Sequence, residues 1–366
     1  MLCSSVCHPF KGFLHTLSAL QNPLRVLDCP AKSQHLITTY CLMELFVKQE
    51  ILQTLPNLDA ILLDIDGVVL DVSQSFRVVA SDVVQWYATN VLKIGGANTF
   101  FTADETELFK NAGGFNNDWD LANAAVALLV AKNAEHPEME IGALRETAPD
   151  FIEYSNEIKR RGGGISAAEN IILDRLNPTQ RREFARNWNP KQVTQLFQEM
   201  YAGDQCRTLY GFAPEHIQGE GFLDKETVLL DANVLPPKAK LGVLTGRTRA
   251  ETQVALERSG LNSRVSANNC VTEDDGVRKP DGRALALLQE KMKFRMGIYI
   301  GDTIDDLNVV KNFRETNASG RARVLSCIVL SGPSGASNRR MFLEAGAEIV
   351  APDVNSVLAY LGSVLK

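Results

Sequence analysis

The sequence predicts an α/β protein: a parallel sheet with helices on both faces and a large helical block inserted after its first strand. Short apolar runs that suit buried parallel strands alternate with helical patterns of about a dozen residues. Residues 76–235, in contrast, show helical spacing nearly throughout. The chain has 366 residues, which is more than one domain of ordinary size needs.

Five apolar runs predict the strands of the sheet. The first is Ala-Ile-Leu-Leu at residues 60–63, and because both of its faces are apolar we expect a buried parallel strand. Similar runs lie at 241–245, 297–301, 324–330 and, more weakly, 347–350. Helical patterns separate or follow them at 248–259, 281–291, 304–314, 338–345 and 354–365. This alternation indicates βαβ units.

The inserted block shows seven helical patterns and little else. They cover residues 75–91, 103–111, 118–132, 151–161, 167–176, 179–188 and 191–201. Thr102 and Glu105 have the spacing of a capping box, and three consecutive glycines at 162–164 predict a break between two helices.

These patterns divide the chain into three parts. Residues 59–75 and 236–366 form the α/β core, and residues 76–235 form the helical insertion. Residues 1–58 are an N-terminal extension that we expect to be poorly ordered, a targeting peptide or a mis-assigned start. Residues 43–55 have a helical pattern, which makes Met43 an alternative translation start.

Composition excludes several classes of function. Thirty-eight Lys and Arg against 44 Asp and Glu give a net charge of −6, so we expect no general nucleic-acid binding. No apolar run is long enough to span a membrane. Seven cysteines without a secretory signal favour a reduced, cytoplasmic protein. The Cys and His residues before residue 42 match no compact zinc-ligand spacing.

Two aspartates follow the first strand. Asp64 and Asp66 are separated by one residue and followed by Gly67. Such a pair can bind a divalent cation through one carboxylate and one backbone carbonyl, leaving the second carboxylate free for proton transfer. A polar strand end followed by a turn would look the same.

Three further motifs follow in order along the chain. Thr245-Gly246 ends the second core strand and suits an anion, since a helix begins directly after it. Lys279 precedes Pro280, which we expect at the first position of a helix. Asp302 ends the third strong strand where a metal ligand would be needed, and Asp306 fits either the metal site or a capping box with Thr303.

The order and placement of these motifs resemble the haloacid dehalogenase (HAD) superfamily, subfamily I, whose members carry a helical C1 cap between the first two motifs. The resemblance covers the core residues. One departure is the segment Thr245-Gly246-Arg247, where much of this subfamily has Thr-Asn.

The resemblance implies a mechanism and a cofactor. Asp64 would be the nucleophile that forms an aspartyl-phosphate, and Asp66 the general acid and base. Thr245, Gly246 and Lys279 would bind the phosphoryl group. Mg²⁺ would be held by Asp64, the carbonyl of Asp66 and Asp302, with Asp306 or the neighbouring Asp305 orienting these ligands. Part of the acidic excess would then surround a cation.

One segment of the insertion, residues 113–121, is a candidate for substrate specificity. Asn116, Asn117 and Trp119 could contact a polar leaving group, although Asn117 could equally cap a helix and Trp119 pack in its core. The segment resembles an uncharacterised branch of HAD phosphatases often labelled phosphoglycolate-phosphatase-like or histidinol-phosphatase-like.

We therefore expect a Mg²⁺-dependent phosphomonoester hydrolase that acts on a small phosphorylated metabolite. A haloacid dehalogenase would not need Asp66. A sugar-phosphate mutase shares every core residue and stays open as an alternative. A phosphoacceptor or a non-catalytic protein on the same fold is disfavoured by the helical block and the intact motifs. The substrate, pathway and oligomeric state do not follow from the sequence.

Overall fold

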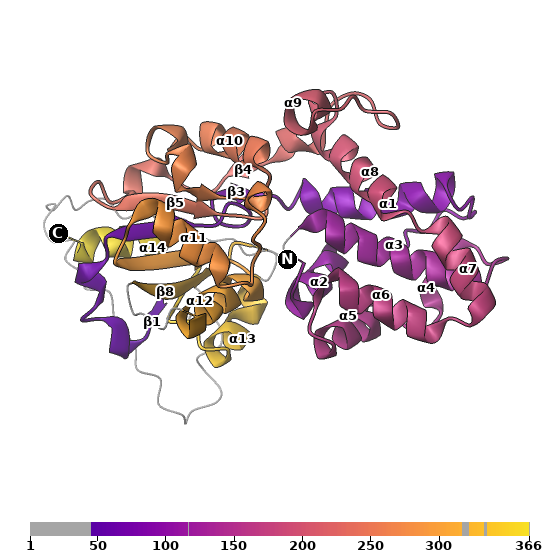
Figure 1. Cartoon of the computed structure of the whole chain (residues 1–366), viewed down its shortest axis with the longest axis horizontal. Coiled ribbons are helices and arrows are strands. Elements are labelled where there is room, and N and C mark those ends of the chain that lie inside the picture. The colour runs from indigo at the N-terminus through magenta and orange to yellow at the C-terminus, as the bar shows by residue number, and fades with distance from the viewer. Residues whose placement is uncertain (1–44, 116, 317–321, 333–334, 366) are drawn as a thin grey trace, which may run out of the picture. The chain divides into compact units, whose positions relative to one another are not determined.

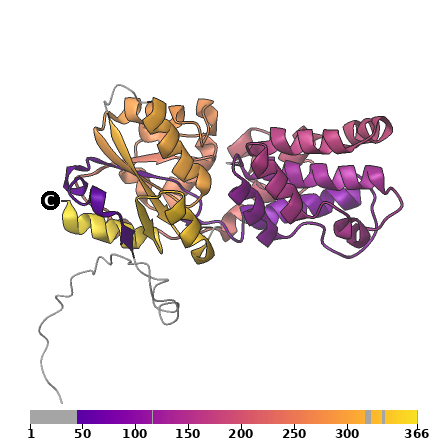
Figure 2. The same ribbon diagram turned by 90° about the horizontal axis from the view of Figure 1, so that it is seen from below.

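The computed structural model describes residues 45–365 except 116, 317–321 and 333–334. Seven strands form one sheet in the order β1-β9-β8-β7-β2-β5-β6 (Figures 1 and 2). The strands are β1 (Phe46–Val47), β2 (Ala60–Leu63), β5 (Lys240–Leu244), β6 (Cys270–Val271), β7 (Met296–Gly301), β8 (Arg323–Val329) and β9 (Ile349–Ala351). All neighbours are parallel except β1 and β9. The predicted fold class is confirmed.

The sheet buries both of its faces. Along β2, Ile61 and Leu63 belong to one apolar cluster, whereas Ala60 and Leu62 belong to another. Helices α11 (Arg283–Met292) and α12 (Ile304–Thr316) contribute to the second cluster, and α10 (Arg249–Arg258) and α14 (Val354–Val364) to the first. This two-sided burial explains why the strand reads as a continuous apolar run.

The register of the central strands places their carboxyl ends side by side. Leu63 of β2 pairs with Val243 of β5 and with Ile300 of β7. The residues that follow these three strands therefore meet at one edge of the sheet, where parallel α/β sheets bind ligands. A separate antiparallel pair, β3 (Leu70–Asp71) and β4 (Thr227–Val228), joins the two chain segments that lead into and out of the insertion.

The insertion consists of helices α1 to α9. They are α1 (Phe76–Asn90), α2 (Thr106–Ala112), α3 (Asp118–Glu135), α4 (Ile141–Glu146), α5 (Phe151–Arg160), α6 (Gly164–Arg175), α7 (Pro178–Asn187), α8 (Pro190–Ala202) and α9 (Cys206–Tyr210). Helix α3 is buried on all sides between residues 121 and 132, as expected of a central core helix. The capping box of Thr102 and Glu105 is present and begins a short 3₁₀ turn before α2.

Three expectations about local structure are corrected. Residues 45–55 are not helical: β1 pairs with β9, and two 3₁₀ turns follow. Val47, Ile51 and Leu55 are buried against the sheet, so the described residues before 59 pack as part of the core. Pro280 does not start a helix, because α11 begins three residues later and Gly282 is its N-cap.

Strands β1, β3, β4 and β6 and helices α4 and α9 were not predicted. Helix α13 (Arg339–Glu344) lies inside its predicted range.

In the described part of the chain, no helix combines the length and the apolar character needed to cross a membrane. The cysteines before residue 42 lie outside the described residues, and Cys206, Cys270 and Cys327 are buried free thiols.

A buried carboxylate on α8 stabilises the insertion. Glu199 is fully buried, and its two oxygens accept hydrogen bonds from the backbone N–H groups of Glu215, His216 and Ile217 and from the side chain of Gln195, over 2.7–3.0 Å. Burial alone would raise the pKa of Glu199, but these donors outweigh it and lower the pKa.

We expect Glu199→Gln to lower the free energy of unfolding by about 1–3 kcal/mol at pH 7, because an amide presents a donor where the backbone also donates. A lowered pKa contributes stability above the pKa of the unfolded chain, and that stability is lost as the pH falls. The difference in the free energy of unfolding between Glu199→Gln and wild type, measured by chemical unfolding, should therefore become smaller toward pH 3. Glu183→Gln, on the surface of α7, is the matched control; equal effects of the two changes would contradict the prediction.

Candidate active site

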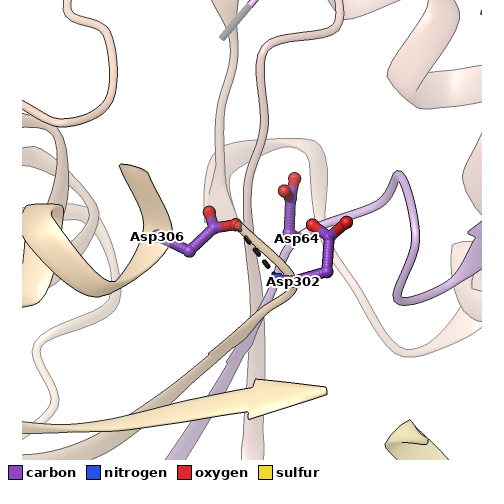
Figure 3. Close-up of side chains that lie close together, drawn as sticks. All are labelled: Asp64, Asp302 and Asp306. Carbon is purple, nitrogen blue, oxygen red and sulfur yellow. Dashed lines mark hydrogen bonds between the residues drawn. The ribbon is translucent and has the colours of Figure 1, made fainter. Parts of the chain in front are cut away.

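The motif residues converge at the carboxyl edge of the sheet. Asp64 follows β2 directly, and its backbone N–H donates to the carbonyl of Ile300 at 2.9 Å. Asp302 follows β7, and Figure 3 shows its carboxylate close to those of Asp64 and Asp306. The three side chains are buried and offer carboxylate oxygens that lie within 4.8 Å of one another.

Lys279 joins two of these carboxylates. Its ammonium nitrogen lies 2.6 Å from Oδ2 of Asp64 and 2.7 Å from Oδ1 of Asp306. All three side chains are at least nine-tenths buried, so little water screens the contacts. A lysine in this position can neutralise anionic oxygens that gather around Asp64.

Burial and charge shift the pKa values of this group in opposite directions. Burial raises the pKa of Asp64 to about 7 against the opposing charge of Lys279. Burial would likewise raise the pKa of Asp306, but Lys279 and hydrogen bonds from Thr303 lower it. Burial would lower the pKa of Lys279, yet the carboxylates of Asp306 and Asp64 raise it. Lys279 therefore stays protonated.

Asp302 is a buried carboxylate that receives no hydrogen bond from the part of the chain that the structure describes. Among the described residues no hydrogen bond ends on its side-chain oxygens, and burial, Asp306 and Asp64 raise its pKa well above the usual value. The backbone approaches it closely on two sides: a Cβ on Gly67 or Gly332 would lie 2.3 or 1.8 Å from Oδ2. An unpaired buried carboxylate in such a cradle fits a bound cation.

Asp306 is held more tightly than Asp302. Its Oδ2 accepts from the N–H groups of Asp302 and Thr303, and Tyr299 donates its hydroxyl to Oδ1 at 2.9 Å. The capping box with Thr303 is therefore present together with the contact to Lys279. Asp305 instead accepts the backbone N–H of Gly114 at 2.9 Å, and burial raises the pKa of Asp305 to about 6. Of the two, Asp306 is the one that belongs to the carboxylate cluster.

Asp66 is more exposed and pairs with Arg247. Nε and Nη2 of Arg247 both lie near Oδ1 of Asp66, at 2.7 and 2.6 Å. The guanidinium also binds Glu226, with Nη2 at 2.8 Å from Oε1 and Nη1 at 3.2 Å from Oε2. Arg247 is therefore a buried cation between two carboxylates, only one of which faces the cavity.

A small cavity of about 30 Å³ is lined by residues of the core and of the insertion. The core contributes Asp64, Asp66, Val72, Gly246, Lys279, Asp302, Thr303 and Asp305, and the insertion contributes Arg77, Thr106, Lys110, Phe115 and Asp118. Lys110 binds Asp118 at 3.2 Å, whereas Arg77 donates through Nε to Thr106 and forms no ion pair among the described residues. Two cations of the insertion thus face the same space as the aspartates.

The remaining predicted residues lie beside this cavity or away from it. Thr245 is buried next to Gly246, and its hydroxyl accepts the backbone N–H of Arg247 at 3.3 Å. Asn117 is buried and Trp119 packs on Phe197 of α8, so neither lines the cavity. Asn117 is the N-cap of α3 by position, but its side chain makes no capping bond. Asn116 lies outside the described residues.

Sequence reasoning missed Arg77, Lys110, Asp118 and Glu226, and it noted Arg247 only as a departure. A lone charged residue on a helix carries no signal in one sequence that separates a cavity wall from a solvated face. Arg247 could have been found, because it lies in the short turn between a buried strand and the next helix, where a buried charge needs a partner.

No protein-family model matches the sequence, and neither does any of the curated proteins. Solved structures do match. A Northeast Structural Genomics Consortium target gives a TM-score of 0.54 over 84% of this chain and 99% of its own, at 16% identity. A phosphatase from Thermococcus thioreducens gives 0.47 over 73% and 91%, at 20% identity. A HAD family hydrolase from Deinococcus radiodurans R1, with bound phosphate and sodium, gives 0.42 over 84% and 97%, at 12% identity.

At these identities the likeness concerns the fold. The chain is a Rossmann-like α/β protein with a helical insertion after the first motif strand. The predicted fold is therefore confirmed, whereas membership of the HAD superfamily stays a prediction. The subfamily and the phosphatase branch stay predictions.

Proposed function

We propose that this chain is a Mg²⁺-dependent phosphomonoester hydrolase of the HAD type that acts on a small phosphorylated metabolite. The observation that carries the proposal is the pairing of Asp64 with Lys279 beside the buried carboxylate of Asp302, which has no hydrogen-bond donor among the described residues. It provides a nucleophile, a cation for phosphoryl oxygens and a ligand for a metal at one end of the sheet.

The proposed reaction has two steps. Oδ of Asp64 attacks phosphorus, and the bond to the ester oxygen breaks while Asp66 gives that oxygen a proton. Asp66 then takes a proton from water, which attacks phosphorus and releases Asp64 and inorganic phosphate. Lys279, Thr245 and the N–H of Gly246 stabilise the phosphoryl oxygens.

The donor set fits a hard divalent cation. Asp64, Asp302 and the backbone carbonyl of Asp66 would hold it, and Asp306 would orient the site or join it. The three carboxylates carry three negative charges when ionised, against the one positive charge of Lys279, so a dication would balance the two in excess. When bound, it allows an anionic carboxylate to approach an anionic phosphate.

The insertion supports a polar or anionic leaving group. Arg77 and Lys110 line the cavity that contains Asp64, and the guanidinium of Arg77 has donors to spare. The cytoplasmic location stays a prediction from cysteine usage, and the absence of nucleic-acid and membrane partners likewise stays a prediction.

The test is a panel of phosphomonoesters with purified protein, in Mg²⁺ and in EDTA. The panel pairs neutral esters with esters that carry a carboxylate or a second phosphoryl group. We expect phosphate release with Mg²⁺ and its loss in EDTA, with recovery when Mg²⁺ is restored. No release from any ester, or release that EDTA leaves unchanged, would contradict the proposal. Turnover that requires a bisphosphate activator would point to the mutase alternative.

A further inference from the structure

We propose that Arg247, held by Glu226, is a positioning residue that fixes the carboxylate of Asp66 so that one of its oxygens faces the leaving group. The inference rests on the proposed function, since it assigns a role within that reaction. It concerns the last residue of the segment Thr245-Gly246-Arg247, which departs from the motif that the chain otherwise resembles.

Arg247 binds one oxygen of Asp66 and leaves the other free. Both of its contacts, from Nε at 2.7 Å and from Nη2 at 2.6 Å, end on Oδ1. Among the described residues no hydrogen bond ends on Oδ2. The Asp66 side chain is 26% exposed and lines the cavity with Asp64 and Lys279, so Oδ2 is the oxygen available to exchange a proton there.

The guanidinium itself has little freedom. Its side chain is 1% exposed, and Glu226, which binds it through two oxygens, is fully buried. Tyr201 accepts from Nη1 at 3.0 Å, and the ring of Phe76 lies 5.0 Å from the guanidinium carbon. A planar fork with all these partners holds its orientation better than a lysine could.

Glu226 is in turn fixed from the insertion side. Its Oε1 accepts from the hydroxyl groups of Ser75 at 3.2 Å and Tyr201 at 2.9 Å. Ser75 precedes α1, and Glu226 precedes β4, so the network stands where the chain enters and leaves the insertion. Arg247 is therefore held by Glu226, which stands with Ser75 at the two connections between core and insertion, and by Tyr201 of α8.

A positioning role makes a specific demand on chemistry. The proton from Asp66 matters most when the leaving oxygen is a poor leaving group, as in an alkyl phosphate. It matters far less for 4-nitrophenyl phosphate, whose phenolate leaves without protonation. If Asp66 loses its position, hydrolysis of the alkyl phosphate should therefore slow much more than hydrolysis of 4-nitrophenyl phosphate. A general structural defect should slow both reactions equally.

The experiment compares kcat/KM for 4-nitrophenyl phosphate and for an alkyl phosphate in wild type, Arg247→Lys and Glu226→Gln. We expect Arg247→Lys to lower kcat/KM for the alkyl phosphate by about 10²-fold and kcat/KM for 4-nitrophenyl phosphate by less than about tenfold. The ratio of the aryl kcat/KM to the alkyl kcat/KM should thus rise at least about tenfold. A pre-steady-state burst of 4-nitrophenol should also appear, because attack of water on the aspartyl-phosphate still needs Asp66 as a base.

The ratio does not depend on how much of the variant is folded, so partial unfolding leaves the test intact. Glu226→Gln keeps the shape of the partner and should shift the ratio in the same direction by a smaller factor. Arg314→Lys, which alters the ion pair with Glu348 just before β9, is the control and should leave the ratio unchanged. If wild type is active on both esters and the aryl-to-alkyl ratio of Arg247→Lys is unchanged, this inference is overturned while the proposed function stands. A wild type inactive on both would overturn the proposed function and this inference with it.

Discussion

Replacing Asp64 by Asn is expected to reduce phosphomonoester hydrolysis by roughly three orders of magnitude or more while the fold is retained. An amide oxygen is a far weaker nucleophile than a carboxylate and cannot form the aspartyl-phosphate. The fold should survive because Asn has the same shape and can still accept the backbone N–H of Ile65, which lies 2.8 Å from Oδ1. Lys279 also keeps its second partner, Asp306.

The measurement is kcat/KM for 4-nitrophenyl phosphate, with circular dichroism to verify folding. Brief reaction with a ³²P-labelled ester followed by acid quenching should leave label on wild type and none on Asp64→Asn. The matched control is Asp59→Asn, which makes the same change at the other end of β2, where Asp59 accepts the N–H groups of Arg295 and Met296. Normal turnover by Asp64→Asn would exclude Asp64 as the nucleophile.

Sequence patterns predicted the strands that are buried on both faces. The strands β2, β5, β7 and β8 are covered on both faces, so each gives an uninterrupted apolar run. The strands β1, β3, β4 and β6 have two residues each, which is too short for any periodicity. The pattern at 43–55 was misread because Phe46 and Val47 serve an antiparallel edge pair with β9, some 300 residues away.

The site could be predicted as far as strand order dictates it. Asp64 and Asp302 follow neighbouring parallel strands, so a sequence that identifies the strands also places these side chains together. The contact between Asp66 and Arg247 spans 181 residues and depends on Glu226 from yet another segment. Likewise, which residues at the start of α3 face the cavity depends on how that helix packs: Asp118 lines the cavity, whereas Trp119 turns to Phe197.

Replacing Lys279 by Met is expected to impair both stability and catalysis. The change leaves the carboxylates of Asp64 and Asp306 buried without their cation, and breaking such a pair typically costs about 3–5 kcal/mol. Activity per folded molecule should fall by roughly 10²–10³-fold, because a charge aimed at the phosphoryl oxygens is lost. The two effects are separable: unfolding in denaturant reports the first, and kcat corrected for the folded fraction reports the second.

The response to Mg²⁺ should distinguish Lys279→Met from the loss of a buried lysine elsewhere in the chain. Since Asp64, Asp302 and Asp306 offer oxygens within 4.8 Å, a bound dication would offset much of the missing charge, and Mg²⁺ should raise the thermal midpoint of Lys279→Met more than that of wild type. The control is Lys132→Met. Lys132 is equally buried but donates to the carbonyls of Leu144, Arg145 and Thr147. Its loss should destabilise the insertion, and Mg²⁺ should raise the thermal midpoint of Lys132→Met only as much as that of wild type. If Mg²⁺ shifted the midpoint of neither variant, the carboxylate cluster would not be the metal site. If it shifted both only by the wild-type amount, the bound metal would not offset the charge that Lys279 supplies.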